Sequence, residues 1–168
     1  MKLFVLIARL LLGGLFIGHG TQKLLGWFGG HGLDGTAGFF ESLGMRPGRQ
    51  HAMVAGAAEA GGGALLAVGL CTPAAAAAIT GVMTTAIRTV HAPNGPWVTD
   101  GGWEYPASLI AAVALITEVG PGALSLDAAR GSERSGPGWA LAAVIAGAGA
   151  STVLLRDWER PAPPAQAG

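Results

Sequence analysis

The chain has 168 residues, of which 51% are apolar and only 12% are charged, whereas soluble domains carry about 25% charged residues. Ten basic residues balance ten acidic ones, so the sequence offers no basic surface for nucleic acid. This composition excludes nucleic-acid binding and predicts a single all-α membrane protein with the lipid bilayer around it.

Five apolar segments are long enough to span a hydrocarbon layer of about 30 Å, which takes roughly 20 helical residues. The first segment runs from about Leu3 to His19. A lysine precedes it, and a lysine followed by an apolar run is also typical of secretory signal peptides. Arg9 interrupts it, however, and no small-residue cleavage pattern follows, so we interpret it as a retained membrane helix. The other four segments cover approximately 51–70, 73–90, 103–119 and 139–155.

The connections between these segments predict how the chain is organised. Only CTP separates the second and third segments, which therefore form a tight antiparallel hairpin. The loop of about 20–50 contains an amphipathic stretch around 36–43, which predicts a helix lying at the membrane interface. We expect an antiparallel four-helix transmembrane bundle over 1–130, an additional C-terminal transmembrane helix within 131–157, and a disordered tail over 158–168.

Small residues recur at three- and four-residue spacing in the second segment, at Gly56, Ala60 and Gly62 or Gly63. In lipid, helices associate by close van der Waals approach, which small side chains permit. The second segment is therefore predicted to lie inside the bundle.

Ionisable side chains within spanning helices are costly, so each needs a partner or a function. Alternating helix direction brings many of them to one membrane face, here called side B, opposite the face where the chain begins, side A. Glu59 lies about 12 Å inside the second segment at 1.5 Å per residue, too deep for a short carboxylate to reach water. Its expected partner is Arg88, Lys23 or His19.

These groups predict a shared polar pocket at side B. Glu59 and His19 are the candidate catalytic residues, and the candidate residues for binding a quinone or another substrate are Lys23, Arg88, His91, Trp103, Glu104 and Tyr105. The basic side chains could instead extend into the lipid headgroups, and the two aromatic residues fit an aromatic belt. Haem or metal binding by the histidines is disfavoured, and no metal is assigned. On side A, Arg9 and Glu118 are predicted to form a structural ion pair.

Five stretches stand out together: RLLLGGLFIGHGTQKLLGWF (9–28), GLDGTAGFFESLGM (32–45), AEAGGGALLAVGLCTP (58–73), GGWEYPASLIAAVALI (101–116) and GPGALSLD (120–127). Over about residues 3–130 the chain thereby resembles the DoxX family of small bacterial membrane proteins, related to the DoxD subunit of thiosulfate:quinone oxidoreductase. The resemblance implies a DoxX-like core of four membrane helices in the bacterial plasma (inner) membrane. It also implies polar motif positions at His19, Lys23, Glu59, Trp103 and Glu104.

Three functions stay open after this resemblance. The first is a subunit or scaffold of a membrane-associated redox complex, with a redox or stress-response protein as partner. The second is a quinone-linked oxidoreductase of the thiosulfate:quinone type, and the third is a small transporter. The single cysteine, Cys71, excludes a dithiol within the chain, and nucleotide-binding motifs are absent, so we expect no cofactor in the chain other than a bound quinone.

Homo-oligomerisation and membrane orientation are also left open by the residues. Counting basic residues places side B in the cytoplasm, whereas the family resemblance implies a cytoplasmic N-terminus and hence a cytoplasmic side A. We adopt the topology of the family.

Overall fold

The computed structural model describes residues 2–158, 160 and 161, and its regular elements are all helical. Within these residues no strand occurs, which confirms the predicted all-α class. Five helices form the body: α1 (Leu3–Leu25), α3 (Gly48–Val68), α4 (Thr72–Ala86), α5 (Glu104–Val119) and α7 (Pro137–Leu154). The connections contain α2 (Gly32–Ser42), the short α6 (Leu126–Ala129), and the 3-10 turns η1 (Trp27–Gly29), η3 (Ala92–Asn94) and η4 (Val98–Asp100).

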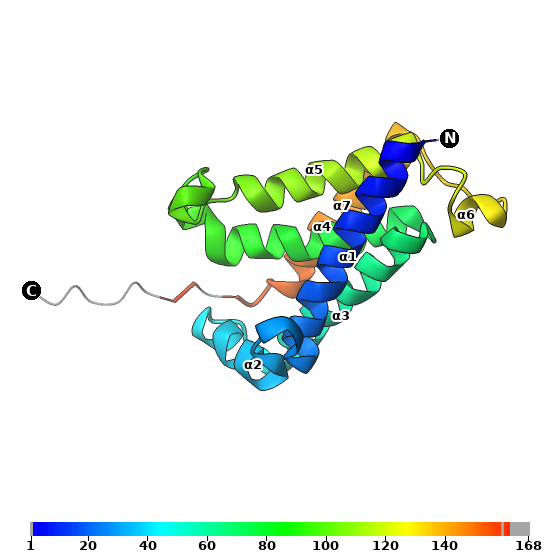
Figure 1. Cartoon of the computed structure of the whole chain (residues 1–168). Helices are drawn as coiled ribbons and strands as arrows, with labels where there is room; N and C mark the ends of the chain where they lie inside the picture. The colour runs from blue at the N-terminus through cyan, green and yellow to red at the C-terminus, as the bar shows by residue number, and fades with distance from the viewer. Residues whose placement is uncertain (1, 159, 162–168) are drawn as a thin grey trace, which may run out of the picture.

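The body helices pack as two neighbouring groups. Helix α1 lies along α3, whereas α4 packs against both α5 and α7 and also contacts α3. In Figure 1, α1 and α3 run diagonally, while α4 and α5 lie side by side along the horizontal. Helix α2 lies at the end of α1 that is far from the N-terminus, and α6 lies at the opposite end of the molecule. The two groups meet where α3 contacts α4, and α2 packs against α3 and α1.

Three helices, α1, α3 and α7, are each long and apolar enough to cross a membrane, which supports a protein embedded in the lipid bilayer. The predicted third segment divides into the 15-residue α4 and a π-helical turn, η2 (Ile87–His91). The predicted fourth segment forms the 16-residue α5. Neither element alone reaches the length of about 20 residues that a spanning helix needs.

Helix α1 ends later than the sequence predicts. Its end was expected near His19, but it continues to Leu25, because Gly26 is the first residue with the left-handed backbone (φ 73°) that ends a helix. The additional turns place Lys23 on the same helix as His19. A helix does form in the first loop, and another forms near the C-terminus at 137–154. The disorder predicted for 158–168 falls mostly outside the described residues.

Glycines bring α1 and α3 into backbone contact. A Cβ added at Gly20 would lie 2.5 Å from the backbone nitrogen of Ala60, and one added at Gly63 would lie 2.7 Å from the carbonyl oxygen of Gly13. These distances are too short for a methyl group, so only residues without a Cβ permit this approach. The predicted close packing of the small residues of the second segment against another helix is therefore confirmed, but the segment is not wholly interior, because Met53, Val54 and Val68 of α3 are exposed.

Candidate functional site

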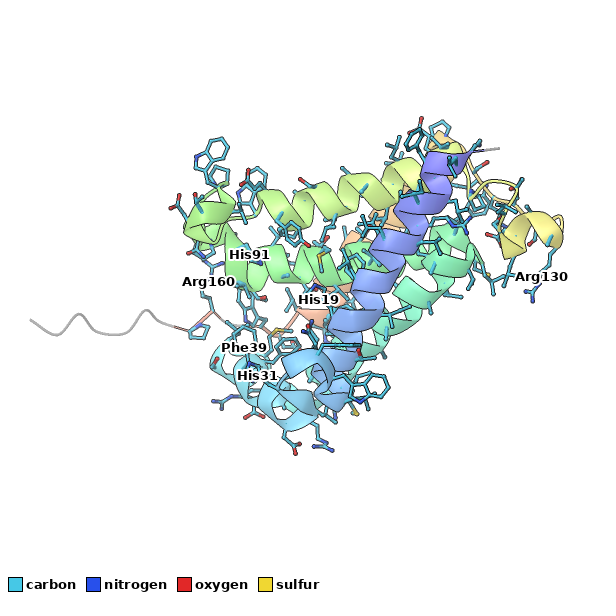
Figure 2. All side chains as sticks on the ribbon, viewed as in Figure 1. His19, His31, Phe39, His91, Arg130 and Arg160 are labelled. Atoms are coloured by element: carbon cyan, nitrogen blue, oxygen red, sulfur yellow. The ribbon has the colours of Figure 1, made fainter. Side chains whose placement is uncertain are left out.

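A cavity of about 470 Å³ lies among α1, α2, α3, α4, α5 and α7. Small-molecule sites typically measure about 300–1,000 Å³ and are mostly apolar, with a few convergent polar groups. The lining of this cavity is mainly apolar, and Figure 2 shows Phe39 on the edge of α2 that faces α4. Its polar lining side chains are His19, Lys23, His51, Glu59, Thr85, Thr89, His91, Tyr105 and Ser151.

An ion pair forms part of the polar wall of the cavity. The ammonium nitrogen of Lys23 on α1 lies 2.6 Å from Oε2 of Glu59 on α3. Glu59 is only 3% exposed, while the side chain of Lys23 is 26% exposed. Apart from Lys23, Glu59 Oε2 has no hydrogen-bond partner among the described residues. The pair therefore gives a buried carboxylate its counter-charge and leaves acceptor capacity facing the cavity.

Three more of the predicted site residues line the same cavity: His19, His91 and Tyr105. His19 Nδ1 lies 3.1 Å from the side-chain oxygen of Gln22. His91 Nδ1 donates to the carbonyl oxygen of Gly101 at 2.6 Å, which ties its ring to the loop before α5. Figure 2 shows His19 on α1 and His91 at the end of the α4 ribbon. Five of the eight predicted residues thus meet around one cavity.

The other three predicted residues do not line the cavity. Arg88 donates to the hydroxyl of Thr152 at 3.3 Å, so its guanidinium turns towards α7. Glu104 Oε1 accepts a hydrogen bond of 2.6 Å from the backbone N–H of Val98, and Trp103 beside it is 41% exposed. The loop before α5 needs an acceptor for its own N–H groups, and Glu104 supplies it instead of reaching the cavity.

Arg9 forms a second buried polar cluster, and its partners are not the predicted ones. Its side chain is 1% exposed and donates to carbonyl oxygens at the end of α3 and in the loop after α5. The acceptors are Leu66 (3.1 Å), Ala67 (3.0 Å), Leu124 (3.0 Å) and Pro121. The side chain of Glu118 is exposed, and no ion pair joins it to Arg9 within the described residues. The predicted ion pair is wrong because backbone carbonyls occupy the planar donor set of the guanidinium.

Asp127 connects the loop after α5 to the start of α4. Its Oδ1 accepts from the N–H of Cys71 at 2.9 Å, and its Oδ2 accepts from the N–H and the hydroxyl of Thr72 at 3.1 and 3.0 Å. The first N–H groups of a helix have no partner within the helix, so this carboxylate caps α4. Burial disfavours the charged form, but the hydrogen bonds from Thr72, Cys71 and Ser132 outweigh it, so the pKa of Asp127 lies below its ordinary value.

Asp127 is expected to stabilise the protein at neutral pH and to lose this effect in acid. A lowered folded-state pKa means that the stabilisation is complete above the unfolded pKa, about 3.9, and is lost as the pH falls through the folded pKa. Asp127→Asn should reduce the free energy of unfolding at neutral pH by about 1.5–3 kcal/mol. Denaturation in detergent between about pH 7 and 3 measures the free energy of unfolding of the variant and of wild type. The difference between the two free energies should become smaller below about pH 4.

The matched control for this measurement is Asp34→Asn, because the Asp34 side chain is 90% exposed. It should have little effect at any pH. If the loss caused by Asp127→Asn stayed constant down to about pH 3, the carboxylate would not be the stabilising group.

A model of the DoxX family matches residues 4–92. The chain belongs to the DoxX family. No curated protein and no solved structure matches the chain. The DoxX match contains His19, Lys23, Glu59 and His91, whereas α5 and α7, which complete the cavity walls, lie beyond it. The resemblance expected through about residue 130 is therefore shown for 4–92.

Sequence reasoning missed two residues of this DoxX protein. His51 lines the cavity, and the sequence signal was its position eight residues before Glu59 on one helix. Asp127 caps α4, and no sequence signal indicated it, because Thr72 directly before Pro73 is itself a capping type of residue. Among the described residues, no three His, Cys, Asp or Glu side chains come together as a metal-binding group.

Proposed function

We propose that this DoxX-family protein is a quinone-binding subunit of a membrane redox complex. The observation that supports the proposal is the apolar cavity of about 470 Å³ whose lining includes the buried Lys23–Glu59 ion pair. A lipophilic quinone has an apolar ring and tail and carbonyl oxygens that need hydrogen-bond donors. The apolar walls suit the ring and tail, and the ammonium group of Lys23 suits a carbonyl oxygen.

The residues of the cavity match the proton chemistry of such a ligand. When bound, a quinone supplies a two-electron, two-proton acceptor. Lys23 would orient the head group, and Glu59 would hold or exchange a proton at the carbonyl oxygen, as a positioned carboxyl group does in general acid–base catalysis. Because the chain has one cysteine, a dithiol within it is excluded, and the electrons would come from a partner subunit that oxidises the substrate.

The geometry favours this function over the others left open. A scaffold alone needs no cavity with a buried charge pair. Direct binding of an anion such as thiosulfate would draw on Arg88, but its guanidinium bonds to Thr152 outside the cavity. A transporter would need a second route of access to the cavity, and nothing in the described residues supports such a route.

Isothermal titration of the detergent-solubilised protein with a short-chain benzoquinone tests the proposal. The double variant Lys23→Met/Glu59→Gln should bind at least about tenfold more weakly, a difference of about 1.4 kcal/mol. The control is Arg49→Met/Asp34→Asn, which removes an exposed ion pair of the same kind and should bind like wild type. The proposal fails if wild type does not bind, or if the two double variants bind equally well.

We also infer two further crossings of the bilayer. One is formed by α4 together with η2, and the other is formed by α5. Together α4 and η2 cover 72–91, a length of about 30 Å at 1.5 Å per residue, and α5 packs along α4. With α1 and α3 these helices would form the antiparallel four-helix bundle, and α7 would be a fifth crossing. The membrane that fits the family is the bacterial plasma membrane, with side A in the cytoplasm.

Cys71 tests this orientation without any substitution. It is the single cysteine of the chain and is exposed in the turn between α3 and α4, on side A. A membrane-impermeant maleimide should therefore label inside-out vesicles but not intact spheroplasts, while a permeant maleimide labels both. Labelling of intact spheroplasts by the impermeant reagent would place side B in the cytoplasm instead.

A further inference from the structure

We propose that His51 is a second polar anchor of the cavity, so that the bound head group carries hydrogen-bonding atoms at two opposite ends. This inference rests on the proposed function, because it narrows the class of ligand that the same cavity takes. It distinguishes a para-quinone ring from lipids with a single polar head, such as fatty acids or long-chain alcohols.

The observation is an unpartnered polar atom. Nδ1 of His51 is buried and has no hydrogen-bond partner among the described residues, and the side chain lines the cavity. Phe39, Phe40 and Met45, which also line the cavity, offer no polar side-chain atom. Buried polar groups in native proteins are normally paired, and an unpaired one calls for an explanation such as a ligand.

The backbone rise between the two anchor positions is close to the span of a two-ended ring. His51 and Glu59 lie eight residues apart on α3, which corresponds to about 12 Å along the helix axis. The para oxygens of a benzoquinone lie about 5 Å apart, given carbonyl bonds of about 1.2 Å on either side of the ring. Two hydrogen bonds of about 2.8 Å extend that span to roughly 11 Å. Because both side chains line the same cavity, a ring of this span is compatible with the two proposed anchors.

Histidine suits either redox state of such a ring. With its proton on Nδ1, the neutral imidazole donates to a quinone carbonyl, and in the other tautomer Nδ1 accepts from a quinol hydroxyl. The Lys23–Glu59 pair likewise offers a donor and an acceptor at the other end. A ligand with one polar head would pair with one anchor only and leave the other unpaired, so it should bind more weakly.

Titration with two probes of equal tail length tests the inference: a decyl benzoquinone and a decyl cyclohexenone, which has one carbonyl. Wild type should prefer the benzoquinone by about tenfold. His51→Leu should remove this preference by weakening benzoquinone binding alone. Its unchanged affinity for the cyclohexenone would show that the variant is folded. His51→Asn, which keeps hydrogen-bonding groups, should retain part of the preference.

His31→Leu is the matched control, because His31 is exposed beside α2 and does not line the cavity. It should leave both affinities unchanged. If wild type prefers the benzoquinone and His51→Leu keeps that preference, or weakens both probes equally, His51 is not an anchor and the proposed function stands. Equal wild-type affinity for the two probes also overturns the two-anchor inference. Binding of neither probe overturns the proposed function together with it.

Discussion

Replacing Arg9 with Met is expected to destabilise the protein by about 4 kcal/mol or more. The guanidinium is 1% exposed and donates to four backbone carbonyls. Without it the carbonyl of Leu66 keeps the N–H of Gly69 as a donor, but the other three carbonyls lose the guanidinium, at a cost of about 1–3 kcal/mol for each one left unpaired. The lost hydrogen bonds are those that join α1 to the end of α3 and to the loop after α5. Unfolding in mixed micelles by increasing SDS measures it.

Two further variants show which property of Arg9 matters. Arg9→Lys keeps the charge but replaces the planar fork by a compact ammonium group, so it should lose an intermediate amount of stability. Glu118→Gln should change the free energy of unfolding by no more than about 0.5 kcal/mol, because the side chain is exposed. If Glu118→Gln were as damaging as Arg9→Met, an ion pair rather than the carbonyl cluster would hold this junction.

Replacing Lys23 with Met is expected to cost about 3 kcal/mol, because it leaves the carboxylate of Glu59 buried without its counter-charge. Glu59 is 3% exposed, so bulk solvent cannot take over the role of the ammonium group. Glu59→Gln should cost less, since the partly exposed Lys23 can extend its flexible stem towards the headgroups. The double variant should recover most of the stability that Lys23→Met loses.

A double-mutant cycle of Lys23→Met and Glu59→Gln measures this coupling in the same micelle assay, and about 2 kcal/mol is expected for groups in direct contact. The corresponding cycle of Arg49→Met and Asp34→Asn, an exposed pair with side chains 61% and 90% exposed, should show no measurable coupling. Additive losses in the Lys23 cycle would show that the contact does not stabilise the fold.

Most helices could be predicted because the signals that set them are local. Pro73 in the first turn of α4 and the Gly-Pro-Gly of 120–122 after α5 mark helix ends in the sequence itself. The small residues of α3 likewise indicated the face that packs against another helix. The shape of the third segment was less predictable, because its last turn is π-helical and no residue there signals that change.

The candidate site could be predicted only in part. Helix direction and register were enough to predict that His19, Lys23, Glu59 and His91 come together, as they do around the cavity, because 1.5 Å of rise per residue fixes the depth of each side chain. Depth does not fix which way a side chain turns. Glu104 lies at the expected level but caps its own loop through the N–H of Val98.

The sequence by itself determined that the chain is an all-α membrane protein, that Glu59 is too deep to lack a partner, and that α3 presents a face of small residues. Only the tertiary structure decided that this partner is Lys23, that Arg9 binds carbonyls rather than Glu118, and that His51 faces the cavity. The physical reason is that composition and periodicity are properties of one segment. Partner choice depends on helix rotation and loop path, which are set by contacts between segments far apart in the chain.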